Sequence, residues 1–320
     1  MMVRNFAVAI CSVGAMTLSV PGMCSESYPI KPIRLVAPSA GGSGDWTARL
    51  LAQGMAEQLG QNVIVDNRSG VVAIETVARA APDGYTMLFF GSGLWNNWLL
   101  SKVSYDPVRD FVPVIGVASS PSVITVHPSL PVHSVKELIA LARAKSSQIS
   151  YSSGPVGSVG YLAGELFKSM ANINMVNVPY KGTGPSVIAV VSGEVQLTFA
   201  AVDTVSQHIK SGKLRALAVV NEAPTKLAPG LPTVSSAGLP GYIVASNNAL
   251  WAPAGTPQAI TNRLYRTAAA YLQRPDVDKK FFDAGLDVIA APAEEFKKKM
   301  NSEIARWRKL IKDLGIRQDP

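Results

Sequence analysis

The chain has 320 residues, of which 48% are hydrophobic and 16% charged, and its 30 Lys and Arg outnumber its 22 Asp and Glu to give a formal net charge of +8. This apolar content argues against an intrinsically disordered chain, and the length predicts about two domains. The basic residues are scattered rather than grouped with aromatic residues, so we expect small anions rather than nucleic acid as partners. Two cysteines cannot form a disulfide scaffold.

The first segment is typical of a secretory signal peptide. Arg4 precedes an almost uncharged apolar stretch, residues 6–20, which is followed by Pro, Gly, Met, Cys and Ser at 21–25. The stretch is shorter than the roughly 20 residues that a transmembrane helix needs. We expect residues 1–24 to be a signal peptide and the mature protein to lie outside the cytoplasmic membrane; the alternative is a buried N-terminal helix. Lipid anchoring is not expected, because Met23 before Cys24 fits a lipidation signal badly.

Short β-branched runs alternate with helical segments from residue 31 onward. We expect strands at 33–37, 62–65, 86–90, 111–117, 122–126, 149–152, 174–178, 195–200 and 215–219. We expect helices at 45–59, 75–80, 134–144, about 257–273 and 293–313, with further helices between the later strands. This alternation predicts an α/β fold with parallel sheets of the doubly wound kind.

Two loops rich in Pro and Gly bracket the middle of the chain. One leaves the first half at 127–131, and the other returns from the second half at 228–241. We therefore expect one α/β lobe, residues 28–127 plus 235–320, to be interrupted by a second lobe, residues 128–234.

Three glycine-rich turns each follow a predicted strand and open a helix, at 38–45, 152–158 and 180–185. Such a turn presents unpaired backbone N–H groups and the positive end of the helix dipole, which together bind anions. In parallel α/β sheets these turns lie at the carboxyl ends of strands, where ligands usually bind. The alternative is that glycine only permits a tight turn. From the sequence alone, both interpretations of the three turns remain open: a shared anion site, or turns with a structural role only.

Catalytic and cofactor motifs are not found. Gly212-Lys213 is followed by Leu214, which excludes a P-loop, and no G-x-S-x-G elbow is present. The three histidines, at 127, 133 and 208, form no metal-binding pattern. We expect a protein that binds without chemistry, with no cofactor and no metal.

Many ordered segments resemble one family. They are YPIKPIRLV at 28–36, the loop at 38–45, LGQ at 59–61, DNR at 66–68, APDGYT at 81–86, YDP at 105–107 with DF at 110–111, VPYKG at 178–182, SGKLRALAV at 211–219, LPT at 231–233 and APAGTP at 252–257. In these segments the chain resembles the extracytoplasmic solute receptors of the tripartite tricarboxylate transporter family, the Bug-type periplasmic binding proteins.

The resemblance implies a two-lobed periplasmic-binding-protein fold of type II, in which each lobe is a sheet flanked by helices and the ligand lies in the cleft between the lobes. It also implies that backbone amides, hydroxyls and water hold a carboxylate. The positions that it assigns to the ligand are Ser39, Ala40, Gly41, Gly42 and Asp45 in one lobe, and Ser153, Gly154, Ser158, Tyr161, Thr183, Gly184 and Asp203 in the other.

The sequence departs from the family pattern at several positions. Tyr161 stands where the family often has a histidine, so a donor remains but its reach and pH response differ. Trp46 and Trp95 could form an aromatic wall of the cleft, which would favour a bulky or aromatic carboxylate. The alternative is that both tryptophans pack within their lobe.

The function that the resemblance implies is a receptor that captures a small organic carboxylate and delivers it to the membrane subunits of a tripartite tricarboxylate-type transporter. An alternative with the same fold is a receptor that signals to a membrane sensor kinase. A secreted enzyme is a distant third, because Asp45 or Asp203 would have to act as its base.

Overall fold

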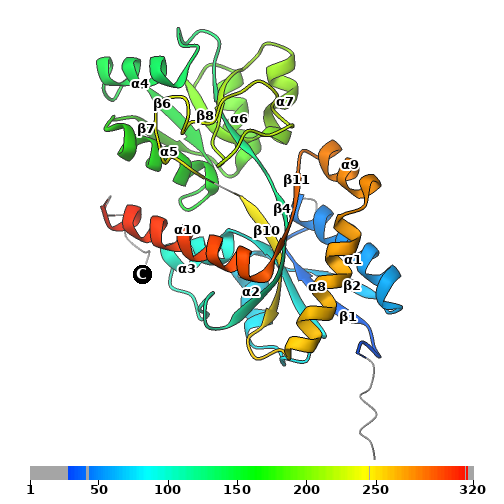
Figure 1. Cartoon of the computed structure of the whole chain (residues 1–320). Helices are drawn as coiled ribbons and strands as arrows, with labels where there is room; N and C mark the ends of the chain where they lie inside the picture. The colour runs from blue at the N-terminus through cyan, green and yellow to red at the C-terminus, as the bar shows by residue number, and fades with distance from the viewer. Residues whose placement is uncertain (1–27, 41–42, 245, 314, 316–320) are drawn as a thin grey trace, which may run out of the picture.

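Two separate β-sheets organise the chain (Figure 1). The structure is a computed structural model that describes residues 28–40, 43–244, 246–313 and 315. The strand order is β11-β4-β10-β3-β1-β2 in the larger sheet and β7-β6-β8-β5-β9 in the smaller one. Helices flank both sheets, which confirms the predicted α/β fold with two sheets. The predicted signal peptide, residues 1–24, lies outside the described residues.

Most elements follow the expected alternation. The strands at 247–253 and 287–292 and the helices at 93–100 and 275–283 were not expected, and the helix expected at 75–80 lies at 70–78. The strands are β1 (Ile33–Ala37), β2 (Val63–Asn67), β3 (Thr86–Gly91), β4 (Phe111–Ser119), β5 (Ser122–Val126), β6 (Ser150–Ser153), β7 (Val176–Pro179), β8 (Leu197–Ala201), β9 (Arg215–Val219), β10 (Asn247–Pro253) and β11 (Asp287–Pro292). The helices are α1 (Ser43–Leu59), α2 (Gly70–Ala78), α3 (Gly93–Leu100), α4 (Val135–Ala144), α5 (Val159–Ala171), α6 (Thr183–Val191), α7 (Val202–Lys210), α8 (Gln258–Leu272), α9 (Pro275–Asp283) and α10 (Ala293–Asp313). No helix in this described part of the chain is both long and apolar enough to cross a bilayer.

The sheets are mixed rather than parallel, which corrects the expectation of purely parallel sheets. Strand β1 pairs in parallel with β2 and β3, but β10 runs antiparallel between β3 and β4. In the smaller sheet β6 pairs in parallel with β7 and β8, whereas β5 runs antiparallel to β8 and β9. The antiparallel strands arise because the chain passes from one sheet to the other after β4 and returns into β10.

The two passages of the chain lie side by side. We call residues 119–122 and 246–248 the crossover; the N–H of Ser120 donates to the carbonyl of Ser246 across it, at 2.9 Å. We call the larger sheet with α1–α3 and α8–α10 the large lobe, and the smaller sheet with α4–α7 the small lobe (Figure 1). We keep the predicted lobe boundaries, 28–127 plus 235–320 and 128–234, as a proposal with one change. Strand β5 was expected in the first lobe, but it pairs with β8 and β9 of the smaller sheet.

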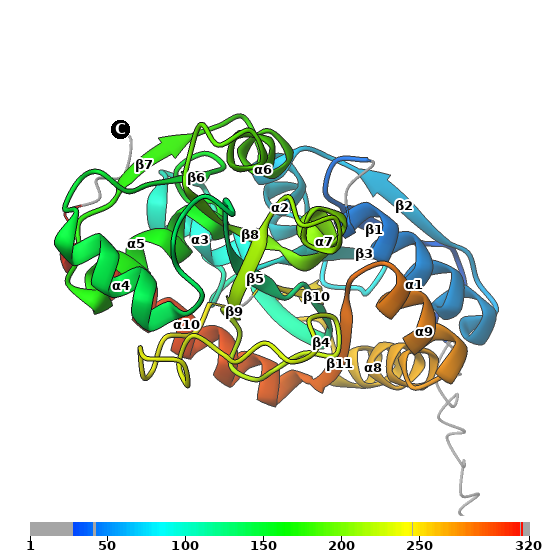
Figure 2. The same cartoon turned by 90° about the horizontal axis from the view of Figure 1, so that it is seen from above.

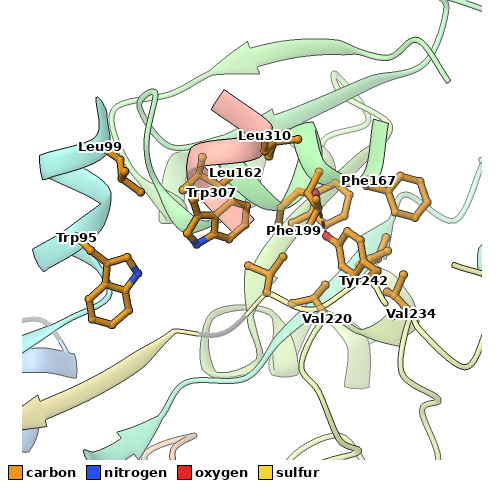
Figure 3. Close-up of a cluster of buried hydrophobic side chains, with 14 of the residues drawn as sticks. Trp95, Leu99, Leu162, Phe167, Phe199, Val220, Val234, Tyr242, Trp307 and Leu310 are labelled. Atoms are coloured by element: carbon orange, nitrogen blue, oxygen red, sulfur yellow. Dashed lines mark hydrogen bonds between the residues drawn. The ribbon is translucent and has the colours of Figure 1, made fainter. Parts of the chain in front are cut away.

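A buried apolar cluster joins the two lobes on one side (Figure 3). It combines Trp95 and Leu99 of α3 with Trp307 and Leu310 of α10, and it continues to Leu162 of α5 in the small lobe. The C-terminal helix α10 therefore packs in the same core as the small lobe, although its own sheet contacts are with β4 and β11. Burial of this surface holds the lobes together.

Helices α1 and α8 approach closely at Gly54, where a Cβ atom would lie 2.1 Å from Cδ2 of Tyr271. Gly54→Ala should therefore lower the free energy of unfolding by about 1 to 3 kcal/mol, although alanine is the better helix former. Denaturant unfolding would measure it. Gly184→Ala is the control, because a Cβ there meets nothing within 4 Å. An equal loss of unfolding free energy in both variants would contradict the close packing of Gly54 against Tyr271.

Candidate functional site

A cavity of about 280 Å³ lies between the lobes at the crossover. Its lining comes from both lobes and from both passages of the chain. The lining residues are Ser43, Ser120, Ser122, Ser158, Val159, Gly160, Thr183, Phe199, Ala200, Ala201, Asp203, Thr204, Ser246 and Asn248. A larger cavity of about 640 Å³ lies within the small lobe alone and contains none of the predicted ligand positions. The interlobe cavity is therefore the better candidate site.

Three helices of the small lobe begin at this cavity. Each follows a strand directly: β6 leads to α5, β7 to α6 and β8 to α7. Figure 2 looks down on the small lobe from above, and α1, α8 and α9 of the large lobe extend to its right. Residues of the first turns of α5, α6 and α7 line the cavity, as does Ser43 at the start of α1 from the large lobe. The positive dipole ends of four helices therefore meet at the cavity, which favours a bound anion.

Ser158 is the predicted small-lobe position with the clearest place in the cavity. It caps α5, and its Oγ accepts the N–H of Tyr161 at 3.3 Å. Gly154 allows the preceding loop to fold against it, since a Cβ on Gly154 would lie 3.1 Å from that Oγ. Burial and the nearby Glu165 raise the pKa of Tyr161, which keeps its phenol protonated. Tyr161 is half-buried and does not line this cavity.

Ser153 has a structural role. It is buried, its hydroxyl donates to the carbonyl of Gly154 at 2.8 Å, and the same oxygen accepts from Nδ2 of Asn177 at 2.9 Å. Ser153 and Gly154 therefore shape the loop that carries Ser158 and do not line the cavity. Thr183 lines it, whereas its neighbour Gly184 does not.

Asp45 is held in a network behind the first glycine-rich loop. Its carboxylate accepts from Nδ2 of Asn67 at 2.9 Å and pairs with Nε of Arg49 at 2.8 Å. Asn67 also donates to the carbonyl of Pro38 at 2.6 Å, so the network joins the loop to β2. This role agrees with a helix-start residue rather than a general base.

The other predicted large-lobe positions belong to the same loop. Ser39 and Ala40 are exposed on it, and Gly41 and Gly42 lie outside the described residues. Ser43, which the sequence analysis did not single out, begins α1 and lines the cavity.

The crossover supplies a polar floor that sequence reasoning missed. Ser120, Ser122, Ser246 and Asn248 all line the cavity, and Ser120 and Ser122 are buried. A usable signal was present: the polar runs SSPS at 119–122 and SNN at 246–248 interrupt apolar strand sequence. Buried hydroxyls need hydrogen-bond partners, and a ligand or water in the cavity can supply them.

The aromatic-wall hypothesis finds no support in the positions of the two tryptophans. Trp95 belongs to the buried cluster of Figure 3 and is 1% exposed. Its ring centroid lies 6.3 Å from that of Trp251 in the core. The ring of Trp46 lies edge-on to Phe281 of α9, with centroids 5.6 Å apart. Neither residue lines the cavity, so packing within the lobe accounts for both.

The charge of the cavity is unusual for an anion site. Of its described lining residues only Asp203 is charged, and no Lys or Arg is among them. Oδ1 of Asp203 accepts from the N–H of Thr204 at 2.8 Å and from its hydroxyl at 3.2 Å. An anion here would be held by neutral donors at helix starts and by serine hydroxyls.

Three solved structures share this architecture. Rpa4515 of R. palustris, determined with adipate, is 36% identical, with a TM-score of 0.76 and coverage of 90% of this chain and 98% of that one. The periplasmic binding protein BugD is 30% identical, with a TM-score of 0.73 and coverage of 91% and 100%. MatC of Rhodopseudomonas palustris, with bound malate, is 28% identical, with a TM-score of 0.73 and coverage of 89% and 100%.

A family comparison identifies the chain directly. The family described as tripartite tricarboxylate transporter family receptor matches residues 47–316. This match and the similarity to BugD confirm the resemblance drawn from the sequence motifs and the periplasmic-binding-protein fold. They also confirm that the fold serves binding rather than catalysis. The chain belongs to the receptor family of the tripartite tricarboxylate transporters, whose members are substrate-binding proteins and not enzymes.

Proposed function

We propose that this protein is an exported receptor that captures a small organic carboxylate between its lobes and delivers it to the membrane subunits of a tripartite tricarboxylate-type transporter. The observation that carries the proposal is the interlobe cavity, at which four helices begin and serine hydroxyls form the floor. Its about 280 Å³ lies just below the roughly 300 to 1,000 Å³ of typical ligand pockets, which favours a small ligand. Rpa4515 was determined with adipate and MatC with malate, and both compounds are small dicarboxylates.

Ligand binding would favour the arrangement in which both half-sites touch the same anion. The small lobe supplies Ser158 and Thr183, and the large lobe supplies Ser43. Because these contacts exist together only when the lobes are close, the ligand shifts the equilibrium towards the closed form. The membrane subunits would then recognise the outer faces of the closed lobes.

A ligand screen tests the capture step. We expect purified mature protein to release a small carboxylate that mass spectrometry identifies, and we expect that compound to raise the melting temperature. A ligand at a hundred times its Kd stabilises the folded state by about 2.7 kcal/mol. Failure of every mono- and dicarboxylate to shift the melting temperature would refute the proposal.

Delivery and export need separate tests. Deletion of the gene should abolish cellular uptake of the identified carboxylate, whereas intact uptake with lost gene induction would support a sensor-kinase partner instead. The N-terminus of the protein from the periplasmic fraction should lie close to residue 25 if residues 1–24 are a signal peptide.

Ser158→Ala should weaken binding of the identified carboxylate by about tenfold, because the variant loses a hydroxyl in the cavity. Loss of the helix cap should also lower stability by about 1 kcal/mol. Ser134→Ala is the matched control: Ser134 caps α4 through the N–H of Glu137 at 3.2 Å and does not line the cavity. Calorimetric titration should show lost affinity in the first variant only. Equal affinity in both variants would remove Ser158 from the site.

A further inference from the structure

Asp203 places a negative charge at the cavity, although the cavity is proposed to bind an anion. It lies in the first turn of α7 and is the single charged side chain among the described residues that line the cavity. None of the ion pairs in the described part of the chain involves Asp203. Among residues 28–40, 43–244, 246–313 and 315, no Lys or Arg forms an ion pair with this carboxylate.

The structure orients this carboxylate from one side only. Both donors that bond it within the described chain belong to Thr204 and reach the same oxygen, Oδ1. Gly285 of the large lobe lies close to Asp203, since a Cβ on Gly285 would be 3.1 Å from Cα of Asp203. Asp203 is exposed, and a carboxylate at a cavity wall is an acceptor for a donor group of a ligand.

The same carboxylate discriminates against a second anionic group. Two carboxylates in one small site repel each other, and one of them must then take up a proton or move away. A ligand hydroxyl or ammonium beside Asp203 would instead gain a charge-assisted hydrogen bond. The ligand carboxylate would then lie at the starts of α5 and α6, where Ser158 and Thr183 are placed.

We propose that Asp203 makes this receptor selective for carboxylates that carry a hydroxyl or amino group, over plain carboxylates of the same length. This inference rests on the proposed function, since it names the class of carboxylate bound in the same cavity. Asp203 acts as a specificity residue through direct contact with the donor group of the ligand.

Calorimetric titration of the mature protein with matched sets of ligands tests the proposal. Each set contains a plain mono- or dicarboxylate, its 2-hydroxy derivative and its 2-amino derivative, such as succinate, malate and aspartate. We expect the hydroxylated or aminated member to bind at least tenfold more tightly than the plain one. Comparison of the two derivatives identifies which donor the site prefers.

Asp203→Asn should reduce this preference about tenfold. The variant should bind the hydroxy or amino derivative more weakly, and it should bind the plain carboxylate as tightly as wild type or more tightly. Asp278→Asn is the control, because Asp278 also lies in the first turn of a helix, α9, but not in the cavity. A melting curve of each variant checks folding.

The possible failures are distinguishable. Equal wild-type affinity within every set, or an equal loss for all members in Asp203→Asn, overturns the role of Asp203 and leaves the receptor function standing. Binding of no carboxylate in any set overturns both.

Discussion

Gly285→Ala should weaken ligand binding by about tenfold to a hundredfold. Gly285 belongs to the large lobe, in the turn between α9 and β11, and a Cβ there would lie 2.6 Å from Cβ of Asp203 in the small lobe. Nearby backbone atoms of Asp203 leave no flexible group that could yield. Overpacking of this kind costs about 1 to 3 kcal/mol, which corresponds to the stated loss when the lobes must meet to bind.

The alanine also introduces local strain that must be separated from the lobe contact. Gly285 ends α9 with a φ of +77°, and its N–H donates to the carbonyl of Phe282 at 2.9 Å. A left-handed alanine costs about 1 to 2 kcal/mol of stability by itself. Gly60→Ala is the matched control: Gly60 ends α1 with a φ of +67°, and a Cβ there meets nothing within 4 Å.

Both variants should therefore lose stability, but only Gly285→Ala should lose affinity. Calorimetric titration with the identified carboxylate and thermal unfolding of both proteins separate the two effects. If Gly60→Ala weakens binding as much, or if neither variant weakens it, the contact between Gly285 and Asp203 does not belong to the ligand-bound form.

A second contact between the lobes lies on the same side of the molecule. The hydroxyl of Thr225, in the segment that follows β9, donates to Oδ2 of Asp287 in β11 at 2.7 Å. Elsewhere, Leu100 of α3 approaches Gly157 in the loop before α5, so closely that a Cβ on Gly157 would lie 2.8 Å from it. Gly157 and Gly285 carry no side chain, which lets the lobes approach each other at these two points.

The sequence predicted the elements of the fold better than their assembly. Periodicity identified β1 to β9 to within about two residues, because each is a short run between clear turn residues and most of them are apolar. It missed β10, the strand that pairs with both β3 and β4, and also the edge strand β11. The sequence of β10, with two asparagines at its start and Pro253 at its end, carries no alternation that distinguishes a strand. Its pairing depends on contacts with distant strands, which local patterns do not encode.

The candidate site was predictable where local backbone chemistry defines it. Ser158, Thr183 and Asp203 lie where glycine-rich turns or strand ends open helices, and all three line the cavity. Asp45 and Ser153 belong to the same motifs but serve the loops, a difference that depends on partners such as Asn67 and Asn177 elsewhere in the chain. The crossover serines come together only because two strands pass side by side.

Glu303→Gln should stabilise the protein at alkaline pH and leave its stability unchanged near pH 4.5. Glu303 of α10 is 6% exposed behind the crossover, where Nδ2 of Asn247 donates to its Oε1 at 3.2 Å. Burial raises the pKa of Glu303 from 4.5 to about 7, although the nearby charges of Arg306 and Lys299 and the side chains of Trp95 and Asn247 oppose the rise.

The sign of the pH dependence follows from this raised pKa. Between pH 4.5 and about 7 the folded protein holds a proton on Glu303 that the unfolded chain releases, so the contribution of Glu303 to stability falls as pH rises through this range. This contribution of Glu303 to stability is fully present below pH 4.5 and is lost above about pH 7. The difference between the two pKa values corresponds to on the order of 3 kcal/mol.

The charges around Glu303 limit how much stability Glu303→Gln can gain at alkaline pH. A cavity of about 350 Å³ behind the crossover brings Glu222 and Asp287 near it as well as Lys299 and Arg306. Glutamine keeps the acceptor for Asn247 and removes the buried charge, but it also removes the attraction to the two cations. The stabilisation of Glu303→Gln above pH 7 should therefore approach but not exceed about 3 kcal/mol.

Denaturant unfolding of wild type, Glu303→Gln and Glu295→Gln across pH 4.5 to 9 measures the effect. Glu295 lies on the same helix but is exposed, so its replacement should leave the pH dependence of stability unchanged. A Glu303→Gln protein that is less stable than wild type at alkaline pH would mean that Arg306 and Lys299 stabilise an ionised Glu303 by more than burial opposes it. Asn247 begins β10 at the crossover and donates a hydrogen bond to Glu303. The protonation state of Glu303 therefore affects a hydrogen bond that anchors one of the two passages between the lobes.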